Sequence, residues 1–154
     1  MLQWVVNIKV IATNRKAYHD YTILETLEAG VVLSGSEIKS VRESRVSLGE
    51  SYVKIEKDGL WLTGAHIARY DPASYMGHDP TRRRRLLLHR KEINRLRSKL
   101  QEKGLTLVPL KIYIKERLAK VEIGLGRGKK LYDKRETIMR RDVEREIERT
   151  LKRK

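Results

Sequence analysis

Short segments with the composition of β-strands, each ended by turn residues, dominate the first 126 residues of the chain. Their apolar residues are β-branched or alternate with polar ones, which is typical of strands. Asp58-Gly59 predicts a tight hairpin between two of these segments, and Glu116-Arg117 predicts another turn. Many short strands with few helices favour a small barrel or α+β domain over a parallel βαβ sheet. The predicted strands are residues 5–11, 21–27, 30–33, 52–55, 60–62, 107–110, 112–114 and 121–125.

Two helices are predicted among these strands. Ser34-Gly-Ser-Glu37 has the spacing of a capping box, so a short helix should begin there. Apolar residues then recur every three or four positions from Leu86 through Ile93 to Leu100. This spacing predicts one amphipathic helix, with Gly104 at the position of its C-terminal cap.

The last 28 residues, from Arg127 onward, differ from the rest of the chain. They hold 12 basic and 6 acidic residues, and Met139, Val143, Ile147 and Leu151 repeat every four positions. Three glycines at 124, 126 and 128 separate this stretch from the strands before it. So narrow an apolar stripe cannot form a core of its own, and a helix this short is marginal alone in water. We predict a domain over residues 1–126 and a basic tail over residues 127–154, disordered alone or helical when bound.

The charge of the chain points to a polyanionic partner. Lys and Arg number 35 against 20 acidic residues, which gives a net charge of +15, and such a surplus suits nucleic acid. The absence of cysteine excludes disulfides, thiolate zinc sites and thiol catalysis. The apolar runs are too short for a bilayer span, and the N-terminus lacks the zones of a signal peptide, so we expect a cytoplasmic protein with no membrane contact.

No enzyme emerges from the motifs. The histidines lack the spacing of a metal site, and Gly124 to Lys130 fails the phosphate-loop pattern, so we expect neither catalysis nor a cofactor. The densest charge is the run Arg82 to Arg85, which can pair with phosphates or form a solvated basic loop. Tyr132 stands among basic residues in the tail with nothing to pack on, which favours a functional role. Residue chemistry alone therefore indicates a basic RNA-binding domain.

Seven blocks of sequence, in order and covering nearly the whole chain, carry a more specific signal. They are Asn14–Tyr21, Leu27–Gly30, Gly35–Arg42, His78–Ile93, Thr106–Leu110, Lys120–Ile123 and Gly128–Arg135. Together they resemble the SsrA-binding protein (small protein B) family of bacterial trans-translation. Departures are small: Ser36 stands where threonine is usual, Gly77 where asparagine often precedes His-Asp-Pro, and residues 1–7 lie outside the pattern.

The resemblance implies a mainly β, α+β fold: an oligonucleotide-binding (OB-type) barrel with flanking helices. It implies that the protein binds the tRNA-like domain of transfer-messenger RNA (tmRNA) and delivers it to stalled ribosomes, with elongation factor Tu joining through the RNA. A general RNA-binding or ribosome-associated structural protein without this specificity is the alternative.

Two sets of residues receive roles from the resemblance. The first set is the RNA-binding face, where a carboxylate has a place only if it accepts from base or sugar donors. It comprises Asn14, Arg15, Lys16, His19, Glu28, Lys39, Arg42, Leu87, His89 and Lys91. The second set belongs to a tail that enters the decoding centre and the empty mRNA channel, and comprises Gly128, Lys129, Lys130, Tyr132, Asp133, Lys134 and Arg135.

Overall fold

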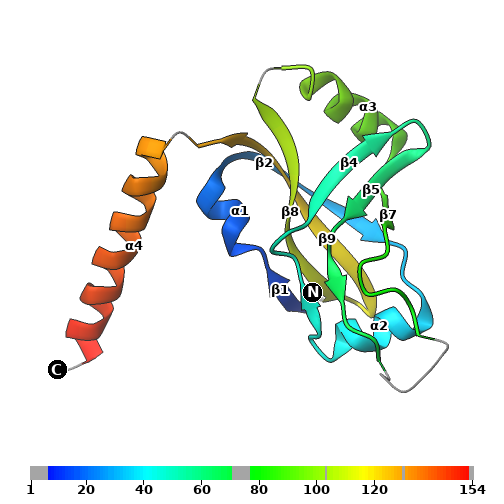
Figure 1. The fold of residues 1–154 in the computed structure, drawn as a ribbon, viewed down its shortest axis with the longest axis horizontal. Helices are drawn as coiled ribbons and strands as arrows, with labels where there is room; N and C mark the ends of the chain where they lie inside the picture. The colour runs from blue at the N-terminus through cyan, green and yellow to red at the C-terminus, as the bar shows by residue number, and fades with distance from the viewer. Residues whose placement is uncertain (1–6, 71–76, 103, 130, 153–154) are drawn as a thin grey trace, which may run out of the picture.

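The computed structural model describes residues 7–70, 77–102, 104–129 and 131–152. Within them, one seven-stranded antiparallel sheet in the order β1-β8-β9-β2-β7-β5-β4 forms the body of the protein, and β3 pairs with β6 beside it (Figure 1). The strands are β1 (Ile8–Thr13), β2 (Tyr21–Val31), β3 (Val46–Ser47), β4 (Tyr52–Glu56), β5 (Gly59–Thr63), β6 (His66–Ile67), β7 (Arg84–Leu87), β8 (Leu105–Lys115) and β9 (Leu118–Gly128). The helices are α1 (Arg15–Asp20), α2 (Gly35–Arg42), α3 (Arg90–Lys99) and α4 (Leu131–Lys152).

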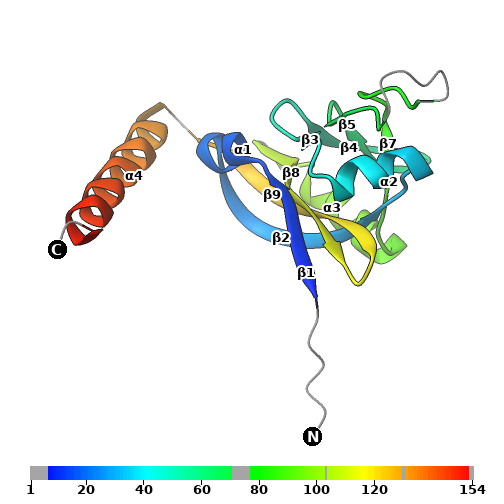
Figure 2. The same ribbon diagram turned by 90° about the horizontal axis from the view of Figure 1, so that it is seen from below.

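The sheet curves strongly into a partly open barrel. Register shifts interrupt the ladders at Val10/Ala12, Ile23/Glu25 and Pro109/Lys111, and such bulges bend strands and increase their twist. The curvature is clearest in β2, which wraps around the body (Figure 2), and it brings β4 close to β8 although they share no ladder. The predicted mainly β, α+β class and OB-like barrel are confirmed.

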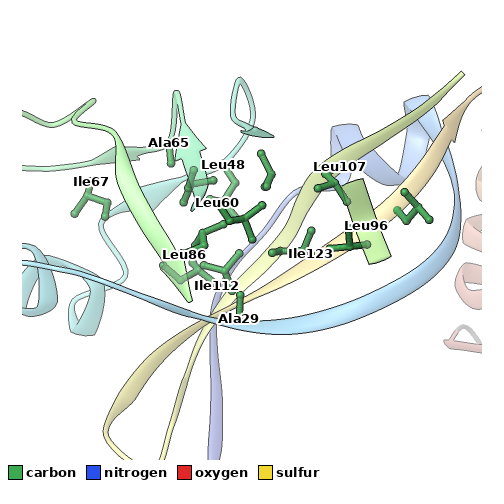
Figure 3. Packing of buried hydrophobic residues seen from close by; sticks show 14 of the residues in the cluster. Ala29, Leu48, Leu60, Ala65, Ile67, Leu86, Leu96, Leu107, Ile112 and Ile123 are labelled. Atoms are coloured by element: carbon green, nitrogen blue, oxygen red, sulfur yellow. The ribbon is translucent and has the colours of Figure 1, made fainter. Parts of the chain in front are cut away.

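The core lies inside this curved sheet. It is built mainly from the inward positions of β5, β7, β8 and β9, and β2, β4, β6 and α2 each add one buried residue. Leu96, the buried residue of α3, closes one end (Figure 3). Leu60, Leu86, Ile112 and Ile123 are each at most 2% exposed. Strand alternation therefore decides which side chain of each pair of neighbours enters the core.

Several predicted elements are confirmed. Ser34 caps α2 with the full reciprocal capping box to Glu37, and the hairpin of β4 and β5 closes at Glu56↔Gly59. β8 and β9 are joined by Glu116 and Arg117, both with positive φ, as a tight hairpin turn demands.

Two other predictions need correction. β2 is one continuous 11-residue strand, without the interruption expected before Gly30. The predicted helix starting at Leu86 is wrong, because Leu86 lies in β7, paired with Leu60, and α3 begins only at Arg90. An apolar strand residue three positions before His89 mimicked the helical spacing. Gly104, with φ +86, lies beyond the C-cap, which is Leu100.

The three glycines before the tail lie inside β9 and do not interrupt it. A Cβ atom on Gly124 would come within 2.9 Å of Leu110 Cδ1, so the glycine permits close packing of two strands. β9 pairs with β2 as far as Tyr21↔Gly128, two residues past the predicted domain limit. The 22-residue helix α4 follows and extends away from the barrel (Figures 1 and 2). None of the helices among the described residues is long and apolar enough to cross a membrane.

Candidate nucleic-acid interface

Glu28, Leu87 and His89, which are far apart in the sequence, line one surface hollow of about 500 Å³. Glu28 lies on β2, Leu87 ends β7 and His89 is the N-cap of α3. Gly30 pairs directly with Leu87 across the β2–β7 ladder, so the register itself brings carboxylate and leucine together. We call this the Glu28 hollow. Three of the residues that the resemblance assigned to an RNA-binding face therefore share one surface, and their contact with RNA stays a prediction.

The carboxylate of Glu28 is held in a fixed orientation by neighbouring side chains. Its Oε2 accepts a hydrogen bond from the Tyr113 hydroxyl, and Lys115 Nζ lies 3.4 Å from the same carboxylate. The Tyr113 bond is the main cause that lowers the pKa of Glu28 below its ordinary value, while burial and Glu28 together raise the pKa of Tyr113. The side chain is still 38% exposed. Glu28 is thus an ionised acceptor with open lone pairs, fixed in direction by a buried tyrosine.

The hollow combines polar and apolar chemistry. Leu87 is 54% exposed and lies in the same lining as the Glu28 carboxylate. Glu92 and Lys120 complete its charged lining. A nucleotide offers both an apolar sugar or base surface and N–H or O–H donors, and this lining matches both.

Asn14 differs from the other candidates because it is only 4% exposed. Its Oδ1 accepts from Ala17 N (3.2 Å) as the N-cap of α1, and its Nδ2 donates to Pro109 O (2.9 Å). Both ends of the amide are therefore used within the protein. This arrangement fixes α1 on β8, so any part of Asn14 in binding acts through the position of α1.

The remaining candidates on α1 and α2 are dispersed, and all of them are exposed except half-buried His19. Arg15 and Lys16 point outward from α1, with Lys16 Nζ 3.2 Å from Glu50, and His19 Nδ1 lies 2.9 Å from Asp20. On α2, Lys39 stacks on Tyr70 at 5.3 Å and Arg42 lines a separate hollow.

Their dispersal follows from the chain path. α1 precedes β2 and α2 follows it. The two groups are thus separated by an 11-residue strand, roughly 36 Å of chain path. Lys91 is exposed in the first turn of α3 and follows His89, which lines the Glu28 hollow, by two positions.

Neither interpretation of the run Arg82 to Arg85, as phosphate-binding residues or as a solvated basic loop, is correct for Arg84. This side chain is fully buried: its Nε donates to Glu37 Oε2 (2.6 Å) and its Nη1 to Ala65 O (2.7 Å). Arg82 pairs with the other Glu37 oxygen. In β7, alternation turns Arg84 inward with Leu86 and leaves Arg85 outward.

The tail candidates are placed as far as the structure describes them. Gly128 ends β9, and Lys129 is bonded to α1 through its backbone N–H to Asp20 O (2.8 Å) and its Nζ to Tyr18 O (3.2 Å). Lys130 lies outside the described residues. Tyr132, Asp133, Lys134 and Arg135 fall in the first turns of α4.

Sequence reasoning missed Tyr113, Lys115 and Lys120. The register Tyr113↔Lys120 places the first and third across the β8–β9 ladder from each other. No local sequence signal connected Tyr113 with Glu28, because the two residues lie 85 positions apart.

Comparison with known proteins gives a consistent result. The profile described as "SmpB protein" matches residues 11–153. The SsrA-binding protein of Chloroflexus aggregans is 62% identical over 149 residues, covering 96% of this chain and 94% of its own. That of Dehalococcoides mccartyi strain 195 is 56% identical over 142 residues, covering 92% and 83%.

A solved structure is similar as well. It is described as "tmRNA-SmpB: a journey to the center of the bacterial ribosome". It matches with a TM-score of 0.66 and 52% identity, covering 78% of this chain and 85% of that one.

Proposed function

The chain belongs to the SmpB family of SsrA-binding proteins, and from that premise we propose that it binds the tRNA-like domain of tmRNA and delivers it to stalled ribosomes. In this proposal the barrel takes the place of the anticodon half that the tRNA-like molecule lacks. It acts by binding, without catalysis or a cofactor, in the cytoplasm. Elongation factor Tu joins through the RNA rather than through this chain.

The Glu28 hollow is the observation that carries the proposal. In a chain of net charge +15, a half-exposed carboxylate beside an exposed leucine does nothing for non-specific attraction to phosphate. It is useful where particular base or sugar donors must be recognised. The geometry therefore supports a specific RNA target over general binding by charge.

A competition titration tests this. The full chain is titrated with the tRNA-like domain of tmRNA, with ordinary tRNA and duplex RNA as competitors, across a salt series. We expect a preference for the tRNA-like domain that survives higher salt and is lost in Glu28→Gln. The matched control is Glu102→Gln, which removes an equal charge from an exposed residue outside the hollow.

The alternative predicts a different result. If the protein were a general RNA binder, all three RNAs would bind alike, with log K falling by roughly 0.7–0.9 per log unit of salt for each phosphate contacted. Glu28→Gln would then bind as well as the wild type or better, because it removes a negative charge.

For the tail, we propose that the stretch from Gly128 to Arg135, followed by the rest of α4, enters the decoding centre and the empty mRNA channel. Tyr132 would stack on ribosomal RNA there. Support comes from α4 itself, which extends from the barrel with Met139, Val143, Ile147 and Leu151 exposed. An occupied channel would exclude such a helix, and this would make delivery selective for stalled ribosomes.

A truncation tests the tail separately from the barrel. Ending the chain after Lys129 keeps the β9–β2 ladder and the contacts of Lys129 with α1. We expect affinity for the tRNA-like domain to stay within about two-fold while tagging of stalled products is abolished. Tagging by the truncated chain would refute the role of the tail, and lost RNA affinity would show that the tail belongs to the RNA-binding surface.

A further inference from the structure

A second hollow adjoins the Glu28 hollow, and Leu88 contributes to the lining of both. It measures about 470 Å³ and lies between the β4–β5 hairpin and α3. Lys57, Arg85, Arg90 and Arg97 supply its charged lining together with one acidic residue. We call it the arginine hollow. Apart from the general possibility that the run Arg82 to Arg85 pairs with phosphates, none of the roles assigned above involves its cations.

Among the described residues, one acidic side chain, Asp58, lines the hollow with these four cations. Within the described residues, none of them forms an ion pair with a carboxylate, whereas other surface arginines of the same chain do, such as Arg83 with Glu56. The acidic residue of the lining, Asp58, accepts a hydrogen bond from Trp61 Nε1 at 3.0 Å. This bond is the main cause that lowers the pKa of Asp58, and the charge of Arg85 adds to it, so Asp58 offsets only part of the positive charge of the hollow. Excess positive charge in a concave surface focuses the field on an incoming anion.

Two of the guanidiniums are already held in place. Arg85 donates to Asp58 O, and its guanidinium lies 5.8 Å from the centre of the Trp61 ring. Arg97 Nη2 donates to Glu56 O at 3.2 Å. Each side chain therefore keeps several N–H donors for another acceptor after losing much of its rotational freedom. A planar fork fixed in this way suits a phosphate group, because less entropy is lost when phosphate binds.

The start of α3 adds positive potential between the two hollows. His89 caps the helix without a side-chain hydrogen bond, so the first-turn N–H groups are not satisfied by it. Arg90 and Lys91 occupy this turn, where the helix dipole disfavours cations, and Glu92 in the same turn offsets one of the two charges. Neither forms an ion pair with a described carboxylate, so their position is unfavourable to the fold and useful to an anionic ligand.

We propose that the arginine hollow binds phosphate groups of an RNA backbone, so that the RNA passes over the start of α3 from this hollow to the Glu28 hollow. The inference rests on the proposed function and assigns a different role to each of the two hollows. The arginine hollow would fix the position of the strand through its phosphates, and the Glu28 hollow would recognise particular nucleotides.

A double variant tests the proposal. Lys57→Gln/Arg90→Gln removes two exposed cations that hold no partner in the described fold. The matched control, Arg45→Gln/Arg69→Gln, removes two exposed cations that do not line the hollow. Each variant of the full chain is titrated against the tRNA-like domain and against small ribosomal subunits, between 0.05 and 0.3 M salt.

Losing two phosphate contacts should reduce the salt slope by roughly 1.4–1.8 and weaken binding roughly 25- to 60-fold at 0.1 M salt. The control should change binding less than about three-fold. A loss with the tRNA-like domain identifies tmRNA as the source of the phosphates. A loss only with subunits would overturn the proposal, because one RNA strand could not then pass from the arginine hollow to the Glu28 hollow. Equal losses in both double variants, or an unchanged slope with both probes, would overturn the proposal.

Two further readouts separate the alternatives. A loss with intact subunits that is absent with their extracted RNA would mean an acidic protein partner, and would also overturn the proposal. Trp4→Phe leaves Trp61 as the one tryptophan of the chain. Adding RNA should then change the fluorescence emission of Trp61, and the midpoint of this change should coincide with the midpoint of binding. The preference over tRNA and the effect of Glu28→Gln decide the proposed function independently, so the two can fail separately.

Discussion

Replacing Glu37 by glutamine tests the buried charge network that joins α2 to β7. Glu37 and Arg84 are both fully buried, and the carboxylate also accepts from Arg82 and from Ser34 N (2.9 Å). Glutamine keeps the shape of the side chain but leaves Arg84 as a buried cation without a counter-charge. Breaking one partner of such a pair costs about 3–5 kcal/mol.

The pKa of Glu37 gives an independent estimate of the same magnitude. Burial alone would raise this pKa, but the hydrogen bonds from Arg82, Ser34 and Arg84 outweigh burial and lower it from 4.5 to about 2. A depression of this size corresponds to about 3 kcal/mol of folding stability. Because the folded pKa is the lower one, this stability is fully present above pH 4.5 and is lost as the pH falls toward 2.

Urea denaturation followed by tryptophan fluorescence measures the effect. At pH 7 we expect Glu37→Gln to lower the free energy of unfolding by about 3 kcal/mol, and at pH 3 the difference from wild type should shrink to about 1 kcal/mol. Glu50→Gln is the control: its side chain is 85% exposed and pairs only with Lys16 in the described residues, so the change should stay below about 0.5 kcal/mol. A loss under 1 kcal/mol at pH 7, or one that does not depend on pH, would refute the reasoning.

Three further substitutions have definite expected outcomes. Tyr113→Phe removes the main bond that lowers the pKa of Glu28, so affinity for the tRNA-like domain, measured from pH 4 to 7, should begin to fall at a higher pH than in wild type. Asn14→Ala removes the N-cap of α1, and urea denaturation should show a loss of about 1–2 kcal/mol; an unchanged midpoint would contradict the capping role. Gly124→Ala places a Cβ 2.9 Å from buried Leu110, and thermal unfolding should reveal a loss of about 1–3 kcal/mol, which a wild-type Tm would exclude.

Local sequence signals predicted those elements whose causes are local. The capping box of α2 needs only Ser34 and Glu37, and the two tight hairpins need only their turn residues and the alternation around them. These features are determined within a few positions of the chain, so they can be predicted without knowledge of tertiary contacts.

The predictions that were wrong, for Leu86 and Arg84, have a common physical origin, because both residues are placed by contacts with residues far away in the sequence. Leu86 fits a helical spacing with Ile93 as well as it fits a strand, and only its pairing with Leu60 decides between them. Once β7 is taken as part of a helix, the inward position of Arg84 cannot be seen. The partner that makes its burial tolerable, Glu37, lies 47 residues earlier.

For the candidate site, the resemblance named the residues but not their arrangement. It selected Glu28, Leu87 and His89, which the β2–β7 ladder brings to one hollow. It also selected Asn14, whose buried amide holds α1 in place. Tyr113 was missed because its part in the site depends on a cross-sheet contact that no local pattern announces.

The continuous strand β9 sets a fixed distance between the Glu28 hollow and the start of the tail. Glu122 lies opposite Glu28 on the neighbouring strand, and the same strand runs to Gly128, where the tail departs. The separation is six residues of extended chain, about 20 Å. Because successive side chains in a strand alternate in direction, gaining or losing one residue here would turn every later side chain to the opposite face. Length variation during evolution is therefore expected in α4 and the connecting loops, while the distance between the Glu28 hollow and the start of the tail stays constant.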